Sequence, residues 1–300
     1  MRPILIPLAE RLGRRVLRRQ GIASRYLPTA EGRVHVFEGR GLGDLPTIVL
    51  LHGISSTGLA FAALLKRLLP HAGRVIAPDY PGHGFSDEPT SRLTPKQLFS
   101  TMSHVIGELA PEDVILIGNS LGGAVALSHA IARPDHVKAL VLLSPAGAHA
   151  TDDEWSGLRN VFDLTTRADA LALLDRIYHE TPWPMRMLAH EMPATLSRRT
   201  VRDLLASASN ADAFTPEALR SLSMPILFFW GRSERLLPDT FLAWFKQHLP
   251  PHAVIDEPEG FGHCPHFDSP ARLAKRVTEF LSNGTSPAQP ERGRNRKVRA

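Results

Sequence analysis

A serine flanked by glycines lies where a strand pattern changes into a helical one. Val114–Ile117 is a short aliphatic run typical of a buried strand, and residues 124–132 are good helix formers. Residues 118–122 between them read Gly-Asn-Ser-Leu-Gly. Small residues at both ends allow a sharp turn that holds Ser120 in a strained conformation with its hydroxyl exposed. The alternative is an ordinary loop serine, but the strand-turn-helix context favours a nucleophile.

A serine hydroxyl is a poor nucleophile at neutral pH and needs a base that takes its proton during attack. Histidine suits this task, because its unperturbed pKa is about 6.5 and it can return the proton to the leaving group. A carboxylate beside the imidazole fixes its tautomer and stabilises the imidazolium. Candidates are His263 and His266 in GFGHCPHFDSP, and Glu234 in WGRSERLLP.

Strand and helix patterns alternate along most of the chain, which predicts an α/β fold with a doubly wound, mostly parallel sheet. Functional groups in such sheets gather at the carboxyl ends of the strands. The expected strands are Val34–Phe37, Thr47–Leu51, Arg74–Ala77, Val114–Ile117, Ala139–Leu143, Ile226–Trp230 and Val254–Asp256. The expected helices are Leu59–Leu69, Pro95–Leu109, Ala124–Ala132, Asp239–His248 and Pro270–Leu281.

The alternation breaks between about His149 and Phe214, where helical patterns such as Ala168–His179 and Ser197–Ser207 occur without a strand. We interpret this segment as a helical cap over the carboxyl ends of the strands. The predicted organisation is a basic helix and linker (1–30), a core (31–147 and 215–282), the cap (148–214) and a basic disordered tail (283–300).

The combination of these motifs resembles the α/β-hydrolase family over roughly residues 33–282. The chain order serine, acid, histidine is the one that family uses, and the helical cap is similar to that of esterases and monoacylglycerol lipases. The resemblance implies that Ser120 is the nucleophile. It also implies that His263, which follows Gly262 just before the last helix, is the base, whereas His266 packs beside it.

The acid departs from the family pattern. The family usually places aspartate in W-G-x-x-D-x-x-x-P, and this chain has Glu234 there. Glutamate is one methylene longer, so the loop or the histidine must sit differently; alternatively, Asp212 or Asp239 orients His263. Some members take the acid from the end of the strand before the cap, where this chain reads LLSPAGAH without a carboxylate, and this favours Glu234.

Backbone amides are expected to stabilise the oxyanion of a tetrahedral intermediate. The resemblance implies that these are the amide of Leu121, at the start of a helix, and that of Ile54, after His52-Gly53. It assigns His52 and Asp79 to turn structure. Neither a metal nor a cofactor is expected, because H-E-x-x-H is absent and the glycines at 39, 41 and 43 do not form a dinucleotide fingerprint.

The net charge of +5 is concentrated at the two ends of the chain. Residues 1–19 hold six arginines and one glutamate, and residues 291–300 hold five basic residues and one glutamate, so the rest is acidic. This argues against nucleic-acid binding. The single cysteine, the absence of a long apolar run and the short, arginine-flanked segment 4–9 predict a cytoplasmic protein, with peripheral membrane attachment as the alternative.

The N-terminal segment has the apolar spacing of an amphipathic helix. Its apolar residues are Leu5, Leu8, Ala9, Leu12 and Val16, and arginines cover the other faces. Two interpretations remain open: weak contact of residues 1–20 with an anionic membrane surface, or packing of the helix on the body of the protein.

The leading functional hypothesis is a cofactor-free serine hydrolase that cleaves an ester with an apolar acyl group through an acyl-enzyme. Alternatives are a carbon–carbon bond hydrolase of the meta-cleavage-product type, although HGISSTG is less glycine-rich than is usual there, and a non-catalytic binding protein. Serine at 120 argues against haloalkane dehalogenase and epoxide hydrolase chemistry. Six residues of the cap either line an acyl pocket or join the cap to the core: Trp155, Phe162, Trp183, Met185, Met187 and Met192.

Overall fold

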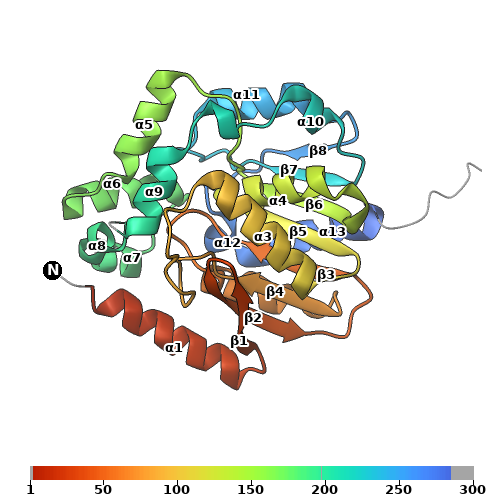
Figure 1. Ribbon diagram of the computed structural model, residues 1–300, viewed down its shortest axis with the longest axis horizontal. Helices are drawn as coiled ribbons and strands as arrows, with labels where there is room; N and C mark the ends of the chain where they lie inside the picture. Colours follow the sequence, from red (N-terminus) through yellow and green to blue (C-terminus); the bar gives the residue numbers. More distant parts are fainter. Residues whose placement is uncertain (1–2, 197, 285–300) are drawn as a thin grey trace, which may run out of the picture.

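Eight strands form one sheet through the middle of the protein in the order β1-β2-β4-β3-β5-β6-β7-β8 (Figure 1). This computed structural model describes residues 3–196 and 198–284. β2 pairs antiparallel with β1 and β4, and all other neighbours are parallel, which confirms the predicted doubly wound, mostly parallel sheet. The strands are β1 (Ala23–Thr29), β2 (Gly32–Arg40), β3 (Thr47–Leu51), β4 (Arg74–Pro78), β5 (Val114–Asn119), β6 (Val137–Leu143), β7 (Ile226–Phe229) and β8 (Val254–Asp256).

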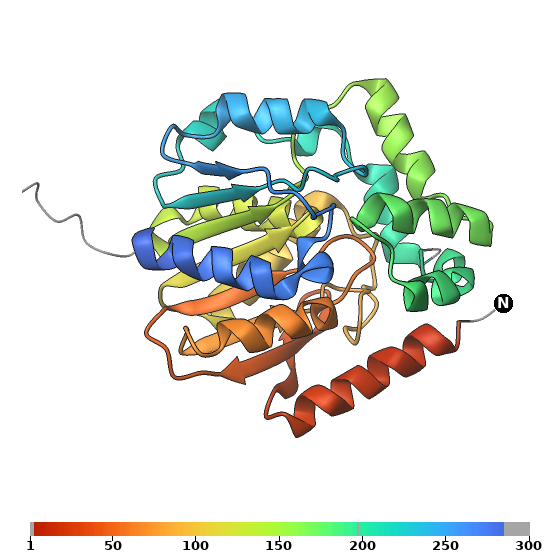
Figure 2. The same ribbon diagram turned by 180° about the vertical axis from the view of Figure 1, so that it is seen from behind.

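Helices cover both faces of this sheet, and each face has its own apolar cluster (Figures 1 and 2). One cluster joins the sheet to α3 (Pro95–Leu109), α4 (Leu121–Ala132), α10 (Pro216–Arg220) and α11 (Asp239–His248). The other joins it to α2 (Ala62–Leu68) and α13 (Pro270–Gly284). Short helical turns connect these elements: η1 (Gly58–Phe61), η2 (Pro134–His136) and α12 (Pro265–Asp268).

Local sequence signals account for the elements that were predicted well. Every residue of β5 is buried, because helices cover the sheet on both sides, and its first four residues are accordingly an unbroken aliphatic run. α3 begins at a capping box between Thr94 and Gln97 with Pro95 in its first turn. β1 was missed: it is an edge strand with partly exposed side chains and a proline at position 28, so it has no apolar signature.

The described residues between β6 and β7 contain no strand, and most of them fold as a group of helices at one end of the sheet (Figures 1 and 2). These inserted helices are α5 (Asp152–Phe162), α6 (Arg167–Ile177), α7 (Trp183–Leu188), η3 (Ala189–Glu191), α8 (Met192–Leu196), α9 (Arg199–Ser207) and η4 (Asn210–Asp212). Most of them share a small apolar cluster of their own, which includes Leu173, Tyr178 and Val201. They face the carboxyl ends of β3 and β5, where residues of both groups line one cavity.

The first helix, α1 (Leu5–Arg19), contacts the body of the protein through Gly13 and Leu17, which are not part of the predicted apolar stripe. Leu17 is buried in the second core cluster, and Gly13 lies against Leu59, whereas the four large residues of the predicted apolar stripe are exposed: Leu5, Leu8, Leu12 and Val16. Among the described residues, no helix combines the length and apolar character needed to cross a bilayer. The predicted tail begins within α13, which extends to Gly284, and residues 285–300 lie outside the described part of the chain.

Candidate active site

Ser120 lies at the turn between β5 and α4 with φ 53° and ψ −118°, a strained conformation for a residue other than glycine. The flanking glycines permit this turn. A Cβ atom on Gly118 would overlap the carbonyl oxygen of Gly122, and one on Gly122 would overlap that of Leu51. The Gly-x-Ser-x-Gly spacing therefore follows from the close approach of helix and strand.

His263 and Glu234 meet at the ends of two separate loops. His263 Nδ1 lies 2.8 Å from Glu234 Oε2, and both side chains are almost fully buried. The other carboxylate oxygen, Oε1, accepts hydrogen bonds from the backbone amides of Leu236 (2.8 Å) and Leu237 (3.0 Å). The longer glutamate side chain is thus fixed at both oxygens, and it reaches the imidazole from the position where the family usually has aspartate.

The charge of Glu234 is set by these contacts. Burial by itself would raise the pKa of the carboxyl group, but the nearby His263 imidazole and the hydrogen bonds from His263 and the Leu237 amide hold the pKa below its ordinary value. Glu234 is therefore ionised at neutral pH and can stabilise a proton on His263.

This lowered pKa predicts a pH-dependent contribution to stability. The ionised carboxylate stabilises the folded state above the pKa of the unfolded chain, and this stabilisation is lost as the pH falls through the folded value. We expect the difference in unfolding free energy between wild type and Glu234→Gln, measured by urea titration, to be smaller at about pH 3 than at about pH 7. A larger difference in acid would mean that folding raises this pKa.

Ser120 and His263 line the same cavity, but no hydrogen bond joins their side chains in this structure. Such contacts are often loose without substrate and tighten in the complex. Asn119 holds the two loops together: its Nδ2 donates to the carbonyl oxygens of Leu143 (3.0 Å) and His263 (2.8 Å). No local pattern predicted this role, because Asn119 occupies a variable position of the Gly-x-Ser-x-Gly motif and its partners are far away in the chain.

A second carboxylate that the sequence did not single out fixes the histidine loop. Asp268 accepts hydrogen bonds from the amides of Gly262 (2.7 Å) and His179 (2.9 Å). This joins the loop that carries His263 to the segment following α6, so the inserted helices and the candidate base share one anchor.

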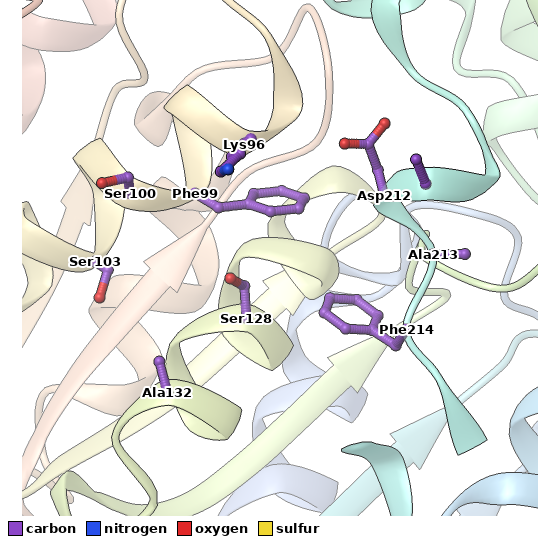
Figure 3. Close-up of a pocket in the computed structure, with 10 residues that line it drawn as sticks. Lys96, Phe99, Ser100, Ser103, Ser128, Ala132, Asp212, Ala213 and Phe214 are labelled. Carbon is purple, nitrogen blue, oxygen red and sulfur yellow. The ribbon is translucent and has the colours of Figure 1, made fainter. Parts of the chain in front are cut away.

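The alternative acids do not reach His263. Asp212 lies in a separate hollow of about 490 Å³ between α3, α4 and η4, near Lys96 and Phe99 (Figure 3). Its carboxylate accepts a hydrogen bond from the Ser209 amide. Asp239 is the exposed first residue of α11. Among the described residues, Glu234 is the carboxylate that contacts the imidazole.

His266, the alternative histidine, is buried and makes no contact with Glu234. Its ring packs 4.4 Å from the ring of Phe61, centroid to centroid, and burial lowers its pKa to about 3. His266 is therefore a neutral packing residue at physiological pH. Cys264 also lines the cavity, but burial raises the pKa of its thiol well above the ordinary value, so it is not a thiolate.

Leu121 and Ile54 follow the carboxyl ends of β5 and β3, and Leu121 is the next residue after Ser120 in the chain. Leu121 is the first residue of α4, where amides lack intrahelical acceptors. Ile54 lines the cavity beside Ser120. Neither amide donates a hydrogen bond to another described group.

His52 and Asp79 organise the turns around these amides. His52 accepts a hydrogen bond from the Tyr80 amide through Nε2 (3.1 Å), and burial lowers its pKa to about 3. The Asp79 carboxylate accepts from the amides of Gly58 (2.6 Å) and Phe85 (2.9 Å). Both residues therefore hold loop backbone in place, as the resemblance implied.

The cavity beside Ser120 has a volume of about 380 Å³ and a mainly apolar lining. Three of the six aromatic and methionine residues proposed for it, Phe162, Met185 and Met192, do line it. The other three do not: Trp155 donates its indole N–H to Asn210 Oδ1, and Trp183 and Met187 are exposed. α1 contributes Ile6, Ala9 and Glu10, which the sequence did not suggest.

No group of three or more histidine, cysteine or acidic side chains in residues 3–196 and 198–284 is arranged to hold a metal ion. The described site consists of Ser120, the His263–Glu234 pair and nearby backbone amides. Its arrangement, a serine and a histidine–carboxylate pair beside free amides, suits the attack of an oxygen nucleophile on a carbonyl carbon.

Known proteins share this architecture. A pimeloyl-[acyl-carrier protein] methyl ester esterase from Xanthomonas campestris is 28% identical over 257 residues, which cover 80% of this chain and 97% of that protein. Two solved structures are similar: a carboxylesterase from Bacillus subtilis (TM-score 0.75, 20% identity, 94% and 100% of the two chains) and a membrane phospholipase A (TM-score 0.80, 22% identity, 94% and 93%).

The family model described as the alpha/beta hydrolase family matches residues 48–276, about three quarters of the chain. The matched region contains the serine turn, the acid loop and the histidine loop, and it includes the inserted helices. The sheet order, the motifs and this match agree, and the chain belongs to the alpha/beta hydrolase family.

Proposed function

We propose that this hydrolase cleaves a carboxylic ester through an acyl-enzyme, with Ser120 as nucleophile, His263 as base and Glu234 as the acid that orients it. The observation that supports this most directly is that Ser120 and His263 line the same mainly apolar cavity, with Glu234 hydrogen-bonded to His263. The similarity to a methyl ester esterase points in the same direction.

The proposed reaction has two halves. His263 takes the proton of the Ser120 hydroxyl as its oxygen attacks the ester carbonyl, and the oxyanion receives hydrogen bonds from the amides of Leu121 and Ile54. The C–O bond to the alcohol breaks, and His263 protonates the leaving alkoxide. Water, deprotonated by His263, then attacks the acyl-enzyme, and the acid leaves as Ser120 regains its proton.

We further propose that the inserted helices act as a cap that selects an apolar acyl group. Leu174, Ile177 and Phe162 of these helices face the cavity, and Glu10 is the one carboxyl group among its lining residues. Burial raises the pKa of Glu10, which favours its neutral form in this environment.

The apolar lining predicts a dependence on acyl chain length. Each methylene that the cavity removes from water contributes about 0.8 kcal/mol, or up to about fourfold in kcat/KM. For p-nitrophenyl esters from acetate to laurate, we expect kcat/KM to rise with each added pair of carbons and then level off when the cavity is full. A decline from acetate onwards would argue against an apolar acyl site.

Labelling with a fluorophosphonate, followed by intact-mass analysis and peptide mapping, tests the nucleophile. We expect one adduct per chain, located on Ser120 and prevented by prior denaturation. Labelling at another residue, or none, would overturn the assignment. If Ser120 were labelled but no ester were hydrolysed, hydrolysis of a carbon–carbon bond would be the favoured reaction. A dienoate meta-cleavage product would then be the substrate to test.

A further inference from the structure

The largest apolar side chains exposed on this protein are concentrated on two helices. Of eleven such residues in the described part of the chain, seven lie on or next to α1 and on α7. We call them the α1–α7 surface: Ile4, Leu5, Leu8, Leu12, Val16, Trp183 and Met187. Leu8 and Leu12 are 57% and 59% exposed, and Trp183 is 75% exposed. A concentration of this kind marks an interaction site.

A buried carboxylate holds the start of α1 against η3, the helical turn that directly follows α7. Glu191, at the end of η3, accepts hydrogen bonds from the amides of Ile4, Leu5 and Ile6 at 2.7–2.8 Å. The preceding residue, His190, bonds through Nδ1 to the carbonyl oxygen of Met187 (2.9 Å). Both views show the start of α1 beside α7 and α8 (Figures 1 and 2). The outward orientation of the stripe on α1 is thus fixed by contacts.

The same helices line the active-site cavity with their inner sides. Ile6, Ala9 and Glu10 of α1, and Met185 and Leu188 of α7, are part of its wall. A partner that binds the α1–α7 surface would therefore be separated from the cavity by the thickness of one helix.

The charges on α1 indicate what the surface fits. Arg11, Arg15, Arg18 and Arg19 are exposed, and none of their side chains forms an ion pair or hydrogen bond with a described residue. Arg11 and Arg15 lie three residues after Leu8 and Leu12, so they flank the apolar stripe. Arg14, on the opposite side, instead donates to Ser24 Oγ. An apolar stripe bordered by free guanidinium groups is complementary to the headgroups and upper acyl chains of an anionic bilayer.

We propose that the α1–α7 surface docks the protein on an anionic phospholipid bilayer, with α1 lying in the interface and Trp183 and Met187 beside it. This places the cavity wall formed by α1 and α7 against the lipid. An ester dissolved in the bilayer then reaches the cavity without crossing bulk water, a consequence that rests on the proposed function, whereas docking itself does not.

Flotation of the full-length chain with phosphatidylcholine vesicles, with and without about a third phosphatidylglycerol, tests this proposal. We expect binding to the anionic vesicles and its weakening in high salt. Leu8→Glu/Leu12→Glu should lower the partition coefficient by at least about tenfold per leucine. Arg11→Glu/Arg15→Glu should lower it by about fivefold or more per arginine. Leu42→Glu, at an exposed leucine outside the surface, is the matched control and should bind like wild type.

The proposal would be overturned if the wild type did not bind anionic vesicles, or if Leu8→Glu/Leu12→Glu bound them as well as wild type. It would also be overturned if the wild type were a dimer that the double variant dissociates, and neither the dimer nor the monomer bound vesicles. Two readouts separate docking from catalysis. Ser120→Ala should bind vesicles like wild type, and Leu8→Glu/Leu12→Glu should hydrolyse p-nitrophenyl acetate at the wild-type rate, because neither leucine lines the cavity. Vesicle binding without ester turnover by wild type would refute the proposed function alone.

Discussion

Replacement of Ser120 by alanine is expected to lower kcat for p-nitrophenyl butyrate by about 10⁴–10⁶-fold, because no acyl-enzyme can form without the hydroxyl. The residual rate would come from the Leu121 and Ile54 amides and from substrate binding, which act on the attack of water as well. The variant should fold normally, since it removes one oxygen atom and leaves the glycine contacts of the turn intact. Steady-state kinetics with circular dichroism measure both effects.

Ser128→Ala is the matched control. Ser128 lies on the same helix, α4, but faces the separate hollow between α3 and α4 (Figure 3). It should keep wild-type activity within about twofold. If Ser120→Ala retained more than about a tenth of the activity, the hydrolysis would have to proceed without a covalent serine intermediate.

Glu234→Gln is expected to lower kcat by about 10⁴-fold, with little change in KM. The amide keeps the shape of the side chain and can still accept hydrogen bonds from the Leu236 and Leu237 amides. It carries no charge, so it does not stabilise the imidazolium of His263, and its NH₂ group can turn the imidazole into the wrong tautomer. The measurement is steady-state kinetics of the purified variant at saturating ester.

The rival acids provide the controls. Asp212→Asn and Asp239→Asn should each retain activity within about twofold, because neither carboxylate contacts His263. Glu234→Asp is a second test. The shorter side chain keeps the charge, but it cannot make the 2.8 Å contact to His263 Nδ1 and the two contacts to backbone amides at the same time. Its activity should therefore lie between those of wild type and Glu234→Gln. A wild-type rate for Glu234→Gln would show that Glu234 is not the acid and that another residue has this role.

Local sequence patterns determined most of the core. Thr47–Leu51, Pro95–Leu109 and Asp239–His248 begin and end where the patterns predicted, since unbroken aliphatic runs, a capping box and helical periodicity are local signals. The turn at Ser120 could also be predicted from the sequence, because the close approach of β5 and α4 permits only glycine at the flanking positions. The family's order of serine, acid and histidine could also be read from motifs.

Other features were decided by contacts between residues far apart in the chain. Periodicity identified the apolar stripe of α1 but not its direction, because a helix buries whichever side its neighbours accept, and here the carboxylate of Glu191 and the buried Leu17 fix the stripe outward. The Asn119 and Asp268 contacts bring distant loops together, so no spacing in the sequence encodes them. The sequence by itself specified the elements and the chemical groups they carry; the tertiary structure decided which carboxylate meets His263 and which side of α1 meets solvent.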